Sequence, residues 1–402
     1  MASRRDFLKV AVAGAAGLAL GGAAGYFARQ GEVDSLQKEI ERLMEKAGVE
    51  VPQLEENFNL FNWTWYANLA LIEEWAKENN INIQMDFYES NDELVAELEL
   101  GARAYDVVVP SASYIPTLIE NGLLQKINLD KIPNHQYIPE SFMGREWDPN
   151  NEYTLIYSYG TTAVAYNEDK MGGDTITSWG DLLDVDNPDS IIRRHAGKVT
   201  MLTESIEVMD SAAIYLASQK GEDVMDWITT LDETKLDEMA NLLIKQKPYL
   251  YGYVSTEEYM EELPIGERFY ISQSWNGDIA GIIWDSDEYE VRMTILNENI
   301  KYVVPDEGAI AWFDNFAIPA NAENIENAHA FINWFLDPVI SAIHTMTIKY
   351  PFPTGIKYVA QEIKDDPTIF VPEELYDKLY WTSLTPEMEA LWNEYWQRVQ
   401  SA

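Results

Sequence analysis

From residue 58 onward, short apolar segments rich in β-branched and aromatic residues alternate with segments of helical periodicity. The segments 58–62, 81–87 and 106–111 have the composition of buried strands, whereas 69–79 and 92–100 repeat apolar residues at helical spacing. Parallel strands need a crossover between them, and a helix usually provides it. The alternation therefore predicts an α/β fold with a parallel sheet covered by helices on both faces.

The same alternation continues through the rest of the chain. The 402 residues allow two or three domain-sized units, and no internal repeat is visible. Further strands are expected at 198–202, 269–273, 300–304 and 309–319, and further helices at 209–219 and 323–335.

Acidic residues far outnumber basic ones. The chain has 68 Asp and Glu against 28 Lys and Arg, a formal net charge of −40. This excess argues against binding to nucleic acid, which depends on Lys and Arg contacts with phosphate, and against docking on an anionic membrane surface. The overall field favours a cationic ligand, although net charge concerns steering and solubility and not the fold.

Cysteine is absent and histidine is scarce, with 0 and 4 residues. The absence of cysteine excludes a disulfide framework, an iron–sulfur cluster, a cysteine-based zinc site, a thiol nucleophile and a lipid-modified cysteine. The scattered histidines disfavour a transition-metal site, so we expect neither metal nor cofactor. A hydrophobic content of 47% excludes intrinsic disorder.

The N-terminus has the layout of an export signal. Arg4 and Arg5 are followed by Phe7 and then by an apolar run over 10–28, a pattern typical of twin-arginine signals. The run is also about as long as a membrane span, so an uncleaved anchor stays open. Residues 1–30 are therefore expected to be a signal or anchor, and 31–57 a helical, acidic linker. The protein is expected outside the cytoplasm, in contact with the membrane only through this segment.

Aromatic and acidic residues gather where strands end or helices begin, which is where α/β sheets bind ligands. Single members have ordinary explanations, since an acid can cap a helix and an aromatic ring can belong to the core. Together, rings attract ammonium groups and carboxylates pair with N–H groups, which suits an elongated organic polycation. The aromatic residues are Trp63, Tyr66, Trp275 and Trp312, and the acids are Glu204, Glu207, Asp278 and Asp314.

Several sequence blocks, in a fixed order from about residue 59 to the C-terminus, resemble the spermidine/putrescine-binding proteins that deliver polyamines to ABC importers. This family belongs to the periplasmic-binding-protein superfamily. Any one block is modestly specific, and their common order carries the resemblance. The blocks are Phe61-Asn62-Trp63-Thr64-Trp65-Tyr66, residues 105–111, 177–182, Trp275-Asn276-Gly277-Asp278, residues 307–314 and residues 318–322.

The resemblance implies a two-lobed, type II periplasmic-binding-protein fold with hinge crossings between the lobes. Lobe 1 is expected to comprise 58–164 and 315–358, and lobe 2 to comprise 165–314 and 359–402. The partners implied are a polyamine ligand and the permease subunits of an ABC transporter. The ligand-binding residues implied are Trp63, Thr64, Trp65, Tyr66, Ser111, Ser113, Glu204, Glu207, Trp275, Asp278, Trp312, Asp314 and Tyr350.

Three positions depart from the family pattern. Trp65 stands where spermidine-type members carry Glu, Ser113 stands where an aromatic ring is frequent, and Thr382 falls near a position that usually holds an amide. Glu204 matches an acid of spermidine-type members, whereas Asp278 matches one of putrescine-type members. The preferred polyamine therefore stays open.

Two other functions compete with this interpretation. A solute-binding protein for another small solute, such as a sugar, would also use tryptophan and carboxylates, although Arg and amide groups would then be expected in the same loops. A glycosidase would use paired carboxylates such as Glu204 and Glu207. The resemblance favours a binding protein without catalytic activity, and the absence of a Walker A motif shows that the chain is not the transporter's ATPase.

Overall fold

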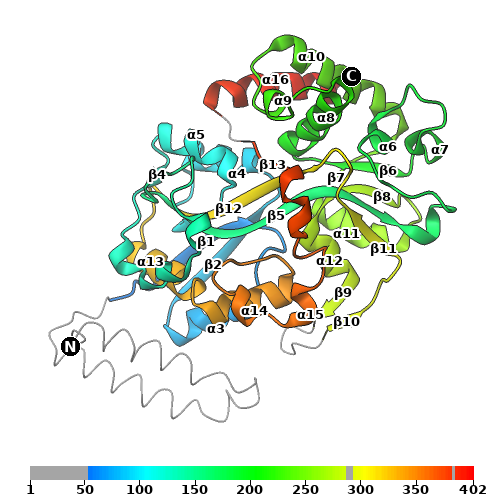
Figure 1. The fold of residues 1–402 in the computed structure, drawn as a ribbon. Helices are drawn as coiled ribbons and strands as arrows, with labels where there is room; N and C mark the ends of the chain where they lie inside the picture. The colour runs from blue at the N-terminus through cyan, green and yellow to red at the C-terminus, as the bar shows by residue number, and fades with distance from the viewer. Residues whose placement is uncertain (1–52, 287–292, 383–384) are drawn as a thin grey trace.

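The computed structural model describes residues 53–286, 293–382 and 385–402. The signal or anchor expected at 1–30, and the linker at 31–57 as far as residue 52, lie outside these ranges. Figure 1 shows two long strands running through the middle of the molecule, with one group of helices above them and another below.

Most strands belong to one curled sheet. Its main path has the order β2-β1-β3-β12-β5-β8-β6-β7, with β11 paired to β5 and both β4 and β13 paired to β12. The strands are β1 (Asn57–Trp63), β2 (Asn82–Tyr88), β3 (Val107–Val108), β4 (Leu124–Gln125), β5 (Thr154–Asn167), β6 (Val199–Leu202), β7 (Leu250–Val254), β8 (Ile271–Trp275), β9 (Trp284–Ser286), β10 (Met293–Ile295), β11 (Ile300–Val303), β12 (Ala309–Pro319) and β13 (Leu379–Tyr380).

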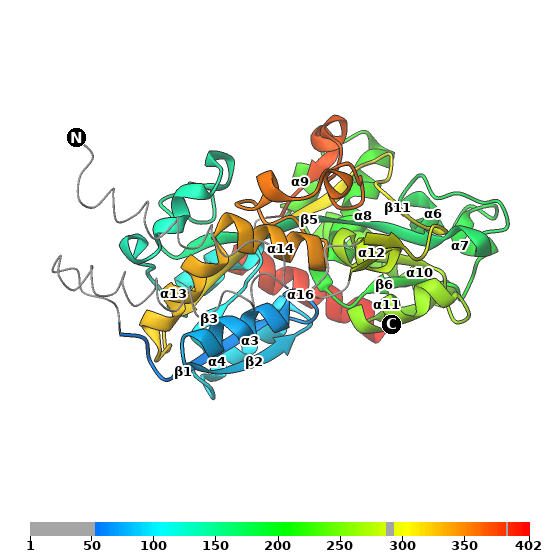
Figure 2. The same ribbon diagram turned by 90° about the horizontal axis from the view of Figure 1, so that it is seen from below.

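Helices cover the sheet in two groups. Figure 2 shows α3 and α4 beside β1 and β2 at one end of the molecule. The helices α6, α7, α10 and α11 lie at the other end of the molecule. The α-helices are α3 (Leu69–Glu78), α4 (Asn91–Leu100), α5 (Ile115–Glu120), α6 (Gly180–Leu183), α7 (Ile191–Arg194), α8 (Ser205–Lys220), α9 (Met225–Ile228), α10 (Glu233–Gln246), α11 (Thr256–Ile265), α12 (Asn276–Ile283), α13 (Ile325–Phe335), α14 (Pro338–Ile348), α15 (Gln361–Lys364) and α16 (Pro386–Ser401).

The parallel sheet predicted from the alternation is confirmed at both ends. In one half β1 pairs in parallel with β2 and β3, and in the other half β6 pairs in parallel with β7 and β8. The centre differs, because β5 and β12 run antiparallel to each other over most of their length. β5 was not predicted from the sequence, because Ser, Gly and Thr at its centre interrupt the apolar pattern of a buried strand.

Two predicted elements have different limits. The helix expected at 209–219, with residues 204–207 at its opening, is observed as α8 over Ser205–Lys220. The strand expected at 106–111 is reduced to Val107–Val108, since Pro110 has no N–H to continue the ladder.

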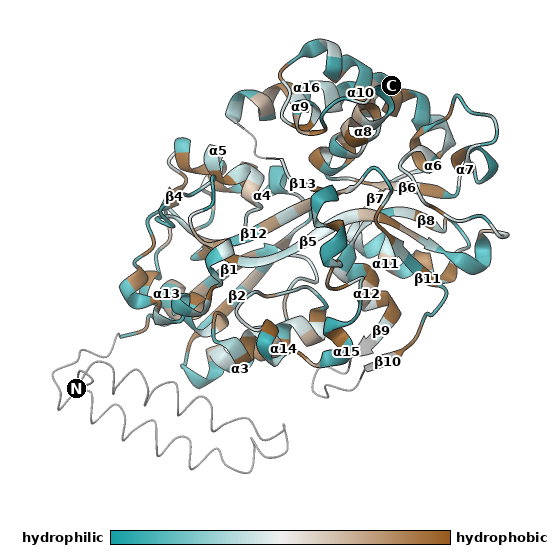
Figure 3. Cartoon of the chain, viewed as in Figure 1, coloured by the Kyte–Doolittle hydropathy of each residue, from teal (hydrophilic) through white to brown (hydrophobic). Residues whose placement is uncertain are grey.

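Two large hydrophobic clusters pack against the sheet, and the one around Trp179 also extends to β1, β2 and α4. One surrounds Phe58 and Phe331, between β1, α3 and α13, and the other surrounds Trp179 and Ile214, near α6 and α8. Trp63 and Trp275 are partly buried and pack against both clusters. Figure 3 shows hydrophobic and hydrophilic residues interspersed on both the strands and the helices. None of the described helices combines the length and apolar character needed to cross a membrane.

The lobe boundaries expected from the sequence fall within β5, within β12 and after a 3-10 helix (Ile356–Tyr358). The β5–β12 pairing is irregular between Asp314 and Asn315, which is the boundary expected in β12. The boundaries themselves stay a prediction.

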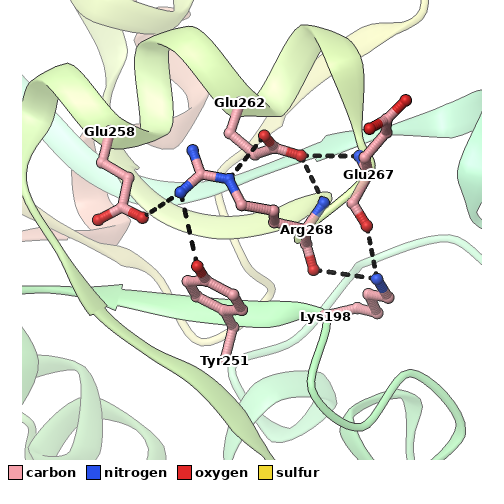
Figure 4. Close-up of polar contacts among 6 residues, drawn as sticks. All are labelled: Lys198, Tyr251, Glu258, Glu262, Glu267 and Arg268. Carbon is pink, nitrogen blue, oxygen red and sulfur yellow. Dashed lines mark hydrogen bonds and ion pairs between the residues drawn. The ribbon is translucent and has the colours of Figure 1, made fainter.

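An ion-pair network ties α11 to the neighbouring strands (Figure 4). Arg268 donates from Nε to Oε2 of the buried Glu262 over 2.9 Å, and it also contacts Glu258 and Tyr251. Lys198 donates to two backbone carbonyl oxygens of the same turn. Burial raises the pKa of Glu262, but hydrogen bonds from the backbone and side chain of Arg268 outweigh it and hold the pKa below its ordinary value.

Candidate ligand-binding site

One cavity lies where strands from both halves of the sheet end and helices begin. Its empty space is about 620 Å³, the opening to solvent included. No lysine, arginine or histidine is among the residues that line it. Its lining consists of Trp63, Thr64, Tyr66, Tyr88, Glu89, Asn91, Ser111, Ser113, Tyr114, Glu204, Ile206, Glu207, Thr256, Trp275, Asp278, Trp312, Asp314 and Tyr350.

Aromatic rings form the walls of this cavity. Trp63 and Trp275 meet edge to face with their ring centroids 6.0 Å apart, one contributed by the end of β1 and the other by the end of β8. Trp312 lies 6.2 Å from Tyr66 and 5.5 Å from Tyr350. Trp63 is fixed by a 2.9 Å hydrogen bond from its Nε1 to the carbonyl oxygen of Val109. The cavity therefore has rigid π-faces on several sides.

Two glycines allow these rings to approach the backbone closely. A Cβ atom on Gly160, which pairs with Trp312 across β5 and β12, would lie 2.3 Å from Cζ2 of that indole. A Cβ atom on Gly277 would lie 2.4 Å from the ring of Tyr350. Because real Cβ atoms do not come this close, a larger residue at either position would displace the wall.

Asp314 is held by two hydroxyl groups. Ser111 donates from Oγ to its Oδ1 over 2.6 Å, and the Tyr66 hydroxyl donates to its Oδ2 over 2.7 Å. Asn91 in turn donates to Ser111 Oγ over 3.1 Å. Residues from three separate segments of the chain therefore orient the Asp314 carboxyl group. Burial raises the pKa of Asp314 to about 7, and the two hydroxyl donors act in the opposite direction.

Asp278 lies in the first turn of α12 with both oxygens bonded. The Tyr350 hydroxyl donates to Oδ1 over 2.6 Å, and Tyr259 donates to Oδ2. Burial raises the pKa of Asp278 to about 6, and the tyrosine hydroxyls lower it in part. This carboxyl group is therefore positioned by tyrosines from two other segments.

Glu204 and Glu207 lie at the start of α8 and are buried, 3% and 8% exposed. Oε2 of each has no hydrogen-bond partner among the described residues. Burial raises the pKa of Glu207 to about 7, and burial followed by the charges of Asp92 and Glu207 raises that of Glu204 well above its ordinary value. Burying an unpaired acid costs free energy, so these oxygens are suited to receive N–H donors from outside the chain.

The structure brings every predicted site residue to this cavity except Trp65. Trp65 has a φ of 59°, and its side chain is 62% exposed and does not line the cavity. Thr382 also lies elsewhere, where its hydroxyl donates to Asp210 Oδ2 over 2.6 Å. That the cavity residues bind a ligand stays a prediction.

Other lining residues were not among the predicted ones. Tyr88 ends β2, Glu89 follows it and Asn91 begins the next helix, so the strand-end rule applied to β2 would have found these three. Ile206 and Thr256 belong to the first turns of α8 and α11, which carry no chemical signal in the sequence. The residues missed are Tyr88, Glu89, Asn91, Tyr114, Ile206 and Thr256.

The cavity combines π-faces with carboxyl groups and contains no basic side chain. Cation–π attraction contributes about 0.5–2 kcal/mol for each ring, and hydrogen bonds to charged groups contribute about 1.5–3 kcal/mol each. Across the described residues, no group of three or more acidic or histidine side chains has the geometry of a metal site. The arrangement therefore suits an organic cation with an apolar body.

The chain is similar to known bacterial solute-binding proteins. The model of the bacterial extracellular solute-binding protein family matches residues 70–371. The putrescine-binding periplasmic protein SpuD of Pseudomonas aeruginosa is 30% identical over 354 residues, which cover 85% of this chain and 91% of SpuD. The spermidine/putrescine-binding periplasmic protein of Escherichia coli is 28% identical over 363 residues, covering 88% of this chain and 95% of that protein.

Solved structures agree on the fold. A putative spermidine/putrescine ABC transporter protein from Listeria monocytogenes superimposes with a TM-score of 0.74 at 23% identity, covering 86% of this chain and 99% of the other. The Tp0655 (TpPotD) lipoprotein of Treponema pallidum does so with a TM-score of 0.68 at 27% identity, covering 85% and 99%.

The fold and its cavity between two halves of the sheet define a two-lobed binding protein of the periplasmic-binding-protein type, as predicted. Within that class, the chain belongs to the bacterial extracellular solute-binding protein family. The two curated relatives above are named as periplasmic binding proteins and not as enzymes. The resemblance to spermidine/putrescine-binding proteins is thereby confirmed.

Proposed function

We propose that this protein binds a polyamine, spermidine or putrescine, between its two lobes and delivers it to the permease of an ABC importer, without catalytic turnover. The relatives named for these ligands support the proposal. The proposal includes a location outside the cytoplasm, as the names of those relatives state for them, with residues 1–30 as the signal or anchor.

The observation that carries the proposal is the pair of buried, unpartnered oxygens on Glu204 and Glu207 in a cavity without a basic side chain. An ammonium group offers several N–H donors and one positive charge, so it would satisfy these oxygens and offset the cost of burying them. Asp314 would hold a second amino group, since each of its oxygens accepts one hydroxyl donor and can accept another.

The methylene segments of the ligand would pack between the indole rings. Trp275 and Trp312 provide apolar faces that also attract the amino groups next to those methylenes. In this proposal residues 58–164 and 315–358 form one wall, and 165–314 and 359–402 close against it.

Titration calorimetry with spermidine, putrescine, maltose and glutamate at neutral pH tests the proposal. We expect binding of at least one polyamine at micromolar concentrations or below. Binding of the sugar without binding of a polyamine would overturn the proposal. Release of product from a chromogenic glycoside would support the alternative function of a glycosidase.

The variant Asp314→Asn tests the site. Loss of one charged hydrogen bond, about 1.5–3 kcal/mol, corresponds to an affinity about 10- to 150-fold lower. Asp186→Asn is the matched control, because it makes the same change in a side chain that is 77% exposed and ion-paired with Lys245. Equal affinity of the two variants would place the site elsewhere.

A further inference from the structure

The loop after β1 supplies no acid to the cavity. Trp63, Thr64 and Tyr66 line it, whereas the left-handed backbone at Trp65 accompanies a side chain that stays outside. A positive φ is strained for a residue with a Cβ atom, so a side chain held there indicates a constrained turn. The first loop therefore provides rings and a hydroxyl group but no counter-charge.

Glu89 lies beside this loop at the same edge of the sheet. It directly follows β2, whose last residue Tyr88 is in register with Trp63, and Thr64 N donates to the Tyr88 carbonyl oxygen over 3.2 Å. The Glu89 side chain lines the cavity and is only partly exposed. The register therefore brings an acid from the second strand next to the loop that lacks one.

The ordinary role of an acid near a helix start is to favour the helix dipole. At α4 other residues perform it: Ser90 accepts from the backbone N–H of Glu93, and Glu93 Oε2 accepts from the backbone N–H of Glu89 over 3.1 Å. The Glu89 carboxylate has no hydrogen bond or ion pair with any other described residue. Its place in the cavity is therefore not explained by the helix.

Asp278 lines the same cavity as Glu89 and comes from α12, in the other half of the fold. The charge of Glu89 contributes to the raised pKa of Asp278, after burial, so the two acids are within electrostatic range. Tyr350 and Tyr259 already donate to Asp278, and none of the cavity residues carries a positive charge that could separate the two acids. Two acids in one cavity without a basic side chain favour the binding of a cation near both of them.

We propose that Glu89 is a ligand-binding residue that binds one amino group of the ligand in the cavity it shares with Asp278, supplying a carboxylate that the loop after β1 does not. The inference rests on the proposed function, since it assigns one end of the same polyamine site.

Spermidine binding to the full chain, measured by titration calorimetry at pH 7.5, tests the inference. We expect Glu89→Gln to bind at least about 10-fold more weakly, since it removes a charged hydrogen bond. Glu99→Gln removes the same charge from the exposed end of α4 and is expected to bind within twofold of the original chain. Equal affinity of the two variants would overturn the inference, whereas an original chain that binds no polyamine would overturn the proposed function instead.

A third variant separates contact from a general field effect. Glu89→Asp keeps the charge but shortens the side chain by one methylene, so a direct contact predicts an affinity several-fold lower than that of the original chain. Affinity unchanged in Glu89→Asp would overturn the contact. Thermal unfolding of each variant checks that the fold is retained.

Discussion

Lowering the pH should weaken polyamine binding well above the ordinary pKa of a carboxyl group. In the empty cavity burial raises the pKa values of Asp314 and Glu207 to about 7. A bound ammonium group favours the ionised form and lowers both values. Below pH 7 the empty site therefore holds protons that the ligand must displace, and affinity falls as the pH falls. Aliphatic amines keep their own charge throughout this range, since they titrate near pH 10.

The magnitude follows from the raised value. For one acid with a pKa of about 7 that is ionised in the complex, lowering the pH from 7.5 to 5.5 reduces affinity about 25-fold. After burial, the charge of Asp314 also raises the pKa of Glu207, so protonation of one acid affects the other. If both release a proton, the loss rises toward several hundredfold, roughly the square of the single-site figure.

Titration calorimetry in two buffers of different ionisation enthalpy measures both the affinity and the number of protons released. Asp314→Asn is expected to lose part of the pH dependence together with part of the affinity. An affinity that changes less than threefold between pH 7.5 and 5.5, with no proton release in either buffer, would refute the reasoning. Thermal unfolding at both pH values checks that the protein stays folded.

Three further variants test the walls and the scaffold. Trp312→Ala should weaken spermidine binding by about 1–2 kcal/mol through the lost cation–π face, which calorimetry measures. Gly160→Ala should also weaken binding, because its Cβ would displace the Trp312 ring, and tryptophan fluorescence should report the displacement. Arg268→Ala should lower the free energy of unfolding in urea at pH 7, because it leaves the buried Glu262 carboxylate without its ion-pair partner. That loss should shrink near pH 3, since the Glu262 pKa is lowered in the folded state and its stabilising contribution disappears as the pH falls through that value.

Much of the site could be predicted from the sequence because strand ends are local features. Trp63 and Trp275 each end a strand, so the rule that ligands bind at carboxyl ends identified them without any knowledge of distant contacts. Glu89 follows the same rule, but its role depends on the register between β1 and β2 and on what faces it across the cavity. Periodicity contains neither piece of information.

The remaining differences have physical causes that act over long distances. Trp65 was expected in the site, yet its backbone conformation accompanies a side chain directed away from the cavity, and no pattern in the six-residue block reveals that turn. β5 was not predicted because Gly160 and its polar neighbours interrupt the apolar pattern of this 14-residue strand. Glycine is required there because a Cβ atom would collide with the Trp312 ring. The residue that interrupts the local pattern is therefore required by contact with Trp312, which lies more than 150 positions further along the chain.

The irregular pairing beside Asp314 has a consequence for the order of events during binding. If the paired strands β5 and β12 bend at this irregularity, atoms close to it move least when the two halves of the molecule rotate. Asp314, Ser111 and Tyr66 would therefore keep their arrangement in an open form, whereas Glu207 would travel with its lobe. The first amino group of the ligand would then bind at a preformed site around Asp314. Closure of the lobes would afterwards bring Glu207 into contact with another amino group.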